Sequence, residues 1–163
     1  MKTKGAGSMI QLYKGEGFWK RPTSYKPGKR LTENAIHQIE NLLGVELPLM
    51  YKKLMNEQNG GELTYRYLLF EDGEAAIIPY FQELDAECGV GLSSVFIEQL
   101  HLPERQVLLT GTMDTWLSLD YRYTTVPKVV YFSANEDGSW SEEVAAQSFD
   151  EFLGKLFLKE NDD

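Results

Sequence analysis

Histidine and cysteine are the side chains best suited to acid–base and nucleophilic chemistry near neutral pH, and the sequence contains three of them. They are His37, His101 and Cys88, and no recognisable spacing pairs one with another. Asp85 and Glu87 stand close to Cys88, and nearby carboxylates raise the pKa of a thiol, whereas a nucleophile requires a lowered one. We therefore expect no catalytic residues and no enzyme. A small enzyme is the weakest alternative, since it requires a pocket where one of the three meets carboxylates.

The motifs that hold metals and nucleotides are missing from the sequence. There is no zinc-ligand spacing, EF-hand loop, P-loop or G-x-S-x-G elbow. The triplets at 15–17 and 89–91 are bare G-x-G patterns, which we interpret as turns. Acidic clusters at 71–74, 85–87, 136–137 and 142–143 offer oxygen ligands for Ca²⁺, but solvated turns are the commoner outcome. We expect neither a metal nor a cofactor.

Charge is divided unevenly along the 163 residues. The formal net charge is −9, from 16 Lys and Arg against 25 Asp and Glu. Residues 1–30, the basic arm, hold eight basic residues and one acid, or +7, which leaves −16 on the acidic body that follows. Because fields of this size steer association, the body is expected to repel nucleic acid and membrane surfaces and to attract a basic protein partner.

The basic arm carries aromatic residues between its cations. Tyr13, Phe18, Trp19 and Tyr25 with eight basic groups are compatible with phosphate contacts and base stacking. Nucleic-acid binding is disfavoured, because the tethered acidic body competes for the same cations. We expect the arm to touch the body through its aromatics, and the body to stay folded without it. Residues 1–8 are either native or an expression remnant preceding a natural start at Met9.

Composition also bears on the compartment. A single cysteine excludes an internal disulfide framework and fits a reducing environment. The basic start is not followed by the apolar stretch of about seven residues that a secretory signal needs. No apolar run approaches the roughly 18 residues of a membrane helix. The sequence therefore predicts a cytoplasmic protein.

Hydrophobic periodicity predicts helices at both ends of the acidic body. Thr32 as N-cap and Gly44 after the last turn bound the first helix. Pro48 begins a second helix, which ends at Asn59-Gly60-Gly61. Ser148 caps a terminal helix. Its predicted buried stripe consists of Phe149, Phe152, Leu153, Leu156 and Phe157.

Between these helices the pattern changes to short β-prone runs. Strands are predicted at 63–70, 75–78, 106–110, 115–120, 128–132 and 141–145. A short helix is predicted from Ser93 or Ser94 to Leu100. This order predicts a single α+β domain over 31–158, followed by a frayed tail at 159–163. We expect two N-terminal helices, a central, mostly antiparallel sheet of five or six strands, and a C-terminal helix packed on that sheet.

Four segments of the body occur in an order that carries a family likeness. They are Ile39-Glu40-x-Leu42-Leu43-Gly44-x-x-Leu47-Pro48-x-x-Tyr51-x-x-Leu54 with Asn59-Gly60-Gly61, Trp116-Leu117-x-Leu119-Asp120-Tyr121, Pro127-x-Val129-Val130-Tyr131-Phe132, and Ala146-x-Ser148-Phe149-x-x-Phe152-Leu153. Together they resemble the SUKH superfamily, which includes fungal regulators of cell-wall glucan synthesis and bacterial immunity proteins. The likeness spans residues 36–157, and neither the basic arm nor residues 81–105 have a counterpart in it.

The resemblance implies a non-catalytic domain that binds proteins. Bacterial members are similar to immunity proteins, which neutralise a cognate toxin domain in the cytoplasm, often a nuclease. The acidic body agrees with this on a separate ground, because nucleases present basic substrate clefts. A regulatory scaffold of the cell-wall type is the alternative.

The residues predicted to contact a partner are acidic or aromatic. They are Glu71, Asp72, Glu74, Asp114, Trp116, Asp120 and Tyr121. Trp116 is equally suited to be a core anchor, and Asp120 to accept hydrogen bonds from the backbone or from Arg122. Pro48, Gly60 and Gly61 have structural roles in the family motif, the two glycines as turn residues with positive φ.

Overall fold

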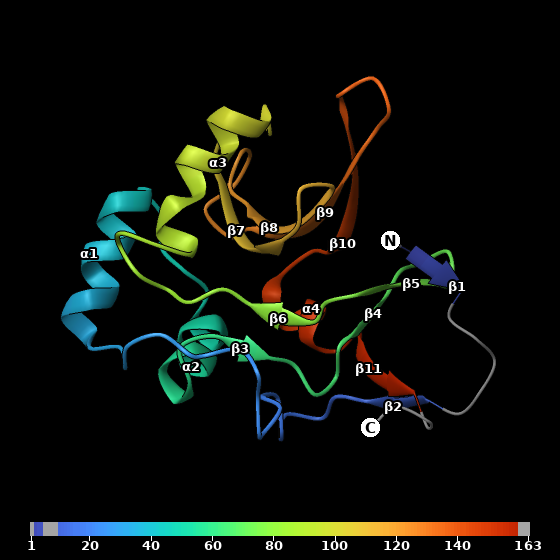
Figure 1. Ribbon diagram of the computed structural model, residues 1–163, viewed down its shortest axis with the longest axis horizontal. Coiled ribbons are helices and arrows are strands. Elements are labelled where there is room, and N and C mark those ends of the chain that lie inside the picture. The colour runs from blue at the N-terminus through green and yellow to red at the C-terminus, as the bar shows by residue number, and fades with distance from the viewer. Residues whose placement is uncertain (1, 5–9, 160–163) are drawn as a thin grey trace.

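Four α-helices and three antiparallel sheets are formed by residues 2–4 and 10–159, the part of the chain that this computed structural model describes (Figure 1). The helices are α1 (Glu33–Leu43), α2 (Leu49–Glu57), α3 (Ser93–Leu100) and α4 (Phe149–Leu153), with a 3-10 turn at Val90–Leu92. The predicted α+β class is confirmed. No helix within the described ranges is long and apolar enough to cross a bilayer.

Local capping chemistry explains where the helices begin and end. The Thr32 hydroxyl accepts a hydrogen bond from the Ala35 amide at 3.1 Å, and the Gly44 amide, at φ +70°, bonds the Glu40 carbonyl. Ser148 caps α4 by accepting from the Glu151 amide. Pro48 is the N-cap of α2 rather than its first helical residue. These ends therefore follow from signals within a few residues of each boundary.

A four-stranded sheet forms the centre of the molecule. Its strands are β7 (Gln106–Gly111), β8 (Thr115–Asp120), β9 (Lys128–Ala134) and β10 (Trp140–Ala146), in the order β10-β9-β8-β7. Its pairs are antiparallel, with Trp116 opposite Phe132 and Asp120 opposite Lys128. The strand predicted at 141–145 is β10, which lies at the edge of this sheet.

The other strands form two further sheets, so one central sheet of five or six strands is not what the chain builds. The five-stranded sheet has the order β1-β5-β4-β11-β2, and a two-stranded sheet pairs β3 with β6. The strands are β1 (Lys2–Lys4), β2 (Ile10–Leu12), β3 (Gly61–Glu62), β4 (Tyr67–Leu69), β5 (Glu74–Ile77), β6 (Tyr80–Phe81) and β11 (Leu156–Lys159).

The predicted terminal helix is too long. It ends at Leu153, and Leu156 and Phe157 belong to β11. There β11 lies between β4 and β2, where Leu156 pairs with Leu68 and Phe157 with Tyr67 and Leu12. Hydrogen bonding to two neighbouring strands overrides a helical apolar period. Lys159 is the last residue of β11, and the remainder of the predicted tail, 160–163, lies outside the described residues.

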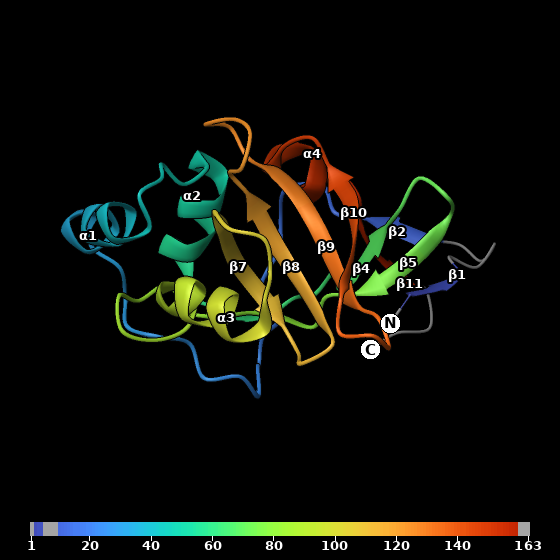
Figure 2. The same ribbon diagram turned by 90° about the horizontal axis from the view of Figure 1, so that it is seen from above.

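Both faces of the four-stranded sheet are covered. One faces the main core, which it shares with α2, α4 and the five-stranded sheet; the other lies under α3, where Leu108, Trp116 and Phe132 are buried. Figures 1 and 2 show α3 and α4 on opposite faces of this sheet. Residues on this sheet are therefore mostly inaccessible, and exposed acidic groups are confined to its turns and edges.

The basic arm is part of this core. Phe18 and Trp19 are 3% and 6% exposed, and Trp19 Nε1 donates to the Leu54 carbonyl at 3.0 Å. The Glu62 carboxylate accepts three hydrogen bonds, from the Thr23 hydroxyl and from the amide and hydroxyl of Ser24. The expected contact through aromatics is thus observed, and these aromatics belong to the same hydrophobic core as the residues after position 30.

Candidate functional site

The acidic turn, Glu71, Asp72 and Glu74, joins β4 to β5. Glu71 and Asp72 are exposed, and Asp72 Oδ1 accepts a hydrogen bond from the Glu74 amide at 2.9 Å. Gly73 has φ +84°, and the Phe70 amide bonds the Glu74 carbonyl at 2.9 Å. Asp-Gly turn chemistry therefore holds two carboxylates outward at the start of β5.

Asp114 lies beyond the other end of β5. It is exposed in the turn between β7 and β8, and its carbonyl accepts from the Ala134 amide at 2.8 Å. A cavity of about 400 Å³ is lined by Asp114 together with Ile77, the last residue of β5, and Tyr80. Four strand residues span roughly 10 Å at the usual rise per residue. Four of the five predicted acidic contacts thus lie at or beyond the two ends of one short strand.

Trp116 is a core residue. It is 6% exposed, and its ring centroid lies 5.4 Å from that of Phe96 on α3. Gly111 leaves room for the indole, because a Cβ at this glycine would lie 2.3 Å from Trp116 Cδ2. Of the two roles considered for Trp116, the structure supports the core anchor, which packs between the four-stranded sheet and α3.

Asp120 forms a buried ion pair. Arg122 Nε donates to Asp120 Oδ1 at 2.9 Å, Arg122 Nη2 to Asp120 Oδ2 at 3.0 Å, and Gln106 Nε2 to Asp120 Oδ1 at 2.8 Å. The Ser118 hydroxyl extends this chain to Gln106 Oε1, and Arg122 reaches Glu142 on β10. Burial opposes ionisation of Asp120, but the hydrogen bonds from Arg122 outweigh it, and the pKa is lowered.

Tyr121 joins the sheet to the corner between α1 and α2. Its side chain is buried, and its hydroxyl donates to the Glu46 carbonyl at 2.6 Å. Burial, followed by the charges of Glu40 and Glu46, raises the pKa of this phenol, so it remains a donor. Asp120 and Tyr121 therefore hold structural elements together, and their contact with a partner stays a prediction.

The family-motif residues occupy tight corners. Gly60 and Gly61 have φ +91° and +143°, which confirms the predicted positive φ. A Cβ at Gly60 would lie 2.9 Å from the Glu83 amide nitrogen, so the backbone of the loop after β6 also excludes a side chain. The Pro48 carbonyl accepts the hydrogen bond from the Lys52 amide that closes the first turn of α2.

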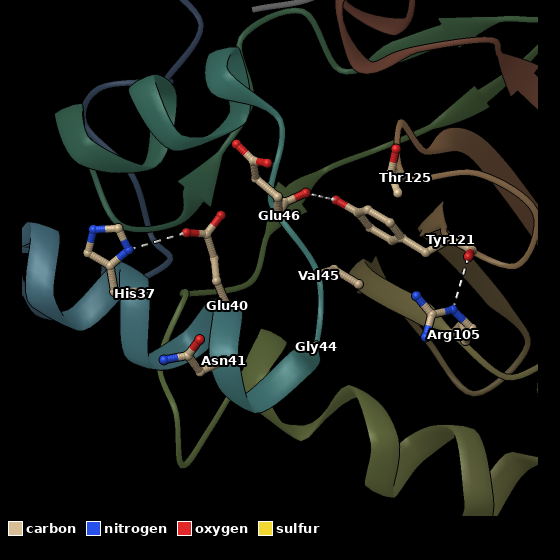
Figure 3. A pocket seen from close by; sticks show the side chains of 9 residues that line it. All are labelled: His37, Glu40, Asn41, Gly44, Val45, Glu46, Arg105, Tyr121 and Thr125. Carbon is tan, nitrogen blue, oxygen red and sulfur yellow. Dashed lines mark hydrogen bonds and ion pairs between the residues drawn. The ribbon is translucent and has the colours of Figure 1, made fainter.

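His37 lines a polar cavity of about 440 Å³ between α1 and Tyr121 (Figure 3). His37 Nδ1 lies 3.8 Å from Glu40 Oε1, and Arg105 Nε donates to the Tyr121 carbonyl at 3.1 Å. Neither Cys88 nor His101 lines this cavity. His101 is exposed and ends α3 in the left-handed conformation, with φ +58°. The two histidines and the cysteine therefore do not share this cavity.

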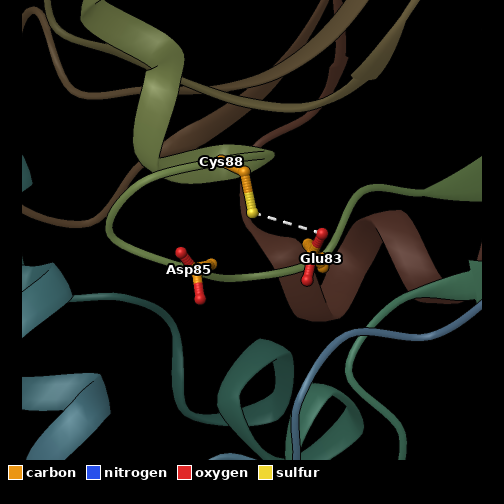
Figure 4. Close-up of side chains that lie close together, drawn as sticks. All are labelled: Glu83, Asp85 and Cys88. Carbon is orange, nitrogen blue, oxygen red and sulfur yellow. Dashed lines mark hydrogen bonds between the residues drawn. The ribbon is translucent and has the colours of Figure 1, made fainter.

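Cys88 lies against two carboxylates (Figure 4). The ligand atoms of Glu83, Asp85 and Cys88 are within 4.8 Å of one another, and Cys88 Sγ donates to Glu83 Oε1 at 3.2 Å. Burial, with the hydrogen bond and charge of Glu83, raises the pKa of the thiol to about 12. The direction agrees with the sequence prediction, and a protonated thiol is a poor nucleophile.

Two features of the structure were not predicted. One is the polar row of Gln106 and Ser118, which supports Asp120 on a buried strand face. The sequence did carry a signal for this row, because Ser118 and Asp120 are polar residues at alternate positions of an otherwise mostly apolar strand. The other is the outer edge of β5, which has no signal in the local pattern because strand order is a property of the whole fold.

Comparison with known proteins gives one match. The family model SUKH_6, described as SMI1-KNR4 cell-wall, matches residues 33–153. The match begins with α1 and ends with α4, and it includes the acidic turn, Asp114 and the four-stranded sheet. Neither the curated proteins nor the solved structures yielded a match.

Proposed function

This chain belongs to the SUKH family of SMI1-KNR4 proteins, and on that premise we propose that it is an immunity-type protein that binds and neutralises a cognate toxin domain. The observation that carries the proposal is the match over residues 33–153. That range contains the acidic surface beside β5, which consists of Glu71, Asp72, Glu74 and Asp114. Family membership supports protein binding in general. The toxin, its nuclease chemistry and a cytoplasmic site of action are parts of the proposal.

Charge indicates the kind of partner. A nuclease must attract phosphate, so its cleft is basic, and an acidic protein can occupy the same positions. Glu71 and Asp72 are exposed at one end of β5, and Asp114 is exposed beyond the other. These carboxylates lie on turns held by backbone hydrogen bonds, which limits the ordering that binding would require. Neutralisation would then follow from occlusion of the toxin's phosphate sites.

The alternative is a regulatory scaffold, which the description of the matching family as SMI1-KNR4 cell-wall favours. A scaffold would also bind proteins through this surface, but its partners would be envelope or signalling proteins and would have no toxicity to suppress.

A co-expression experiment distinguishes the immunity-type protein from the regulatory scaffold. The chain is expressed together with the polypeptide encoded next to it in its genome, and survival and nucleic-acid cleavage by that polypeptide are measured with and without the chain. The proposal predicts that the neighbour is toxic alone, that the chain restores growth, and that the two co-purify. A harmless neighbour that the chain does not bind contradicts it, and co-purification with envelope proteins supports the scaffold.

A further inference from the structure

We propose that the outer edge of β5 is a strand-acceptor site, and that its ligand is a basic, extended segment of a partner protein that adds to the five-stranded sheet in antiparallel register. The biological source of that segment rests on the proposed function. The acceptor edge does not depend on the proposed function, because the strand pairing, burial and charge around β5 support it on their own.

The pairing of β5 differs on its two sides. On the inner side it is held by β4, with Tyr67 opposite Ile77 and Leu69 opposite Ala75. On the outer side it pairs with β1, which consists of residues 2–4 and lies at the edge of the sheet (Figure 2). In that register Lys2 is opposite Ala76 and Lys4 is opposite Glu74. The edge is thus shown accepting a strand of three residues.

The acceptor and the strand that covers it differ in their relation to the family. β5 lies inside the family match at 33–153, whereas β1 lies outside it. The edge therefore lies within the matched range, and the covering strand, like β2 and β11 of the same sheet, lies outside it. The pairing of β1 with this edge shows the antiparallel register that an added strand would adopt.

β1 covers the outer edge of β5, and β5 itself carries none of the residues that usually protect an edge against strand addition. Exposed edges are commonly blunted by lysine, proline or a bulge. The sequence of β5 is Glu-Ala-Ala-Ile, and its register with both neighbours is continuous. Ala75 and Ala76 are buried, while Ile77 is 46% exposed. With β1 displaced, this short strand of small residues would leave its backbone approachable, which is the requirement for β-augmentation.

Charge selects a basic ligand for this edge. Glu74 begins β5 and Glu71 and Asp72 precede it, while Asp114 lies in the cavity lining beyond Ile77. Opposite charges across a strand pair stabilise it, and the residue of β1 opposite Glu74 is Lys4. A partner strand longer than β1 would extend past Ile77 toward Asp114, with acidic residues at both of its ends.

A tethered strand competes with any ligand in solution, because a short linker gives it an effective concentration of the millimolar order. The test therefore uses the full chain with Thr3→Pro and Lys4→Pro together. Consecutive N–H groups in a strand point to opposite sides, so one of the two prolines must remove a donor that faces β5. The probe is a labelled peptide with the sequence of residues 1–8, MKTKGAGS, and backbone amide shifts of the ¹⁵N-labelled protein locate it.

The proposal predicts that the peptide shifts the amides of Glu74–Ile77 in the double-proline protein and binds the unsubstituted chain at least about tenfold more weakly. A peptide with N-methyl groups on its Thr and second Lys keeps its charge and should lose binding. Glu74→Lys in the same protein should weaken binding, whereas Glu98→Lys, the same charge change on exposed α3, should not.

Three outcomes would each overturn the proposal: amide shifts elsewhere in the protein, no amide shifts at all, or equal binding of the methylated peptide. So would a dimer of the unsubstituted chain that exchanges β1, since the ligand would then be a second copy. Failed toxin neutralisation would leave these results unaffected.

Discussion

At the scale of single residues, the Asp120–Arg122 pair is the most consequential polar contact in the sheet. The Asp120 side chain is 4% exposed and that of Arg122 is 15% exposed. Arg122→Met leaves a buried carboxylate without its main partner, and we expect a loss of about 2–4 kcal/mol in the free energy of unfolding at pH 7. Urea denaturation measures it. Asp120→Asn combined with Arg122→Met should recover part of the loss, because no buried charge remains; a double variant less stable than Arg122→Met contradicts this account.

The Glu62 carboxylate makes the stability of the folded protein depend on pH. Hydrogen bonds from the Ser24 amide, Thr23 and the Ser24 hydroxyl lower its pKa to about 2. A lowered carboxyl pKa contributes stability that is complete above the unfolded value, near 4.3, and is lost as the pH falls through the folded value. Glu62→Gln should therefore be less stable than the natural chain at pH 7 and should approach it near pH 2. Urea midpoints between pH 7 and 2 test this, with exposed Glu98→Gln as control. Parallel curves for the Glu62→Gln and natural proteins would refute it.

At the scale of elements, the basic arm is expected to be indispensable to the fold. Trp19→Ala removes a buried indole and its hydrogen bond to Leu54, and should destabilise the protein by about 3–5 kcal/mol. Lys14→Ala, an exposed change on the same arm, should stay within about 0.5 kcal/mol. Urea unfolding compares the two. If Trp19→Ala costs no more than Lys14→Ala, the arm is the separable appendage that its charge suggested.

The elements also show which features the sequence could predict. Thr32, Gly44 and Ser148 act on backbone groups within a few residues, so the ends they mark were predictable. Leu156 and Phe157 satisfy a helical period, yet they form a strand because β4 and β2 lie beside them. Phe18 and Trp19 sit among cations and glycines, and only tertiary packing reveals them as core. Long-range pairing leaves no local signal, which is why the division into three sheets was missed.

In the candidate site, too, the features set by local sequence were predictable and those set by distant segments were not. Turn chemistry around Gly73 correctly indicated exposed carboxylates at Glu71 and Asp72. Trp116 and Tyr121 have the composition of contact residues, but their exposure depends on α3 and on the corner at Glu46, which lie far away in sequence. Residue type alone does not separate a buried aromatic anchor from an exposed one.

At the scale of the whole molecule, the net charge of −9 combines two parts that fold together. The arm, at +7, contributes Tyr13, Phe18 and Trp19 to the hydrophobic core of a body at −16. The field that a partner meets is set by local groups, and beside β5 these include Glu71, Asp72, Glu74 and Asp114 as well as the lysines of β1. We therefore assign partner selection to this surface.

The dissociation constant for the polypeptide encoded next to this chain, measured by calorimetry across a salt series, tests that assignment most directly. The variant Glu71→Lys with Asp114→Lys is compared with Glu98→Lys and Glu104→Lys, which make the same charge change at exposed positions elsewhere. We predict that salt weakens binding by the natural chain, that the first variant loses at least about tenfold in affinity, and that the second loses far less. Equal losses in the two variants, or affinity indifferent to salt, would contradict the claim that the acidic surface beside β5 binds the partner.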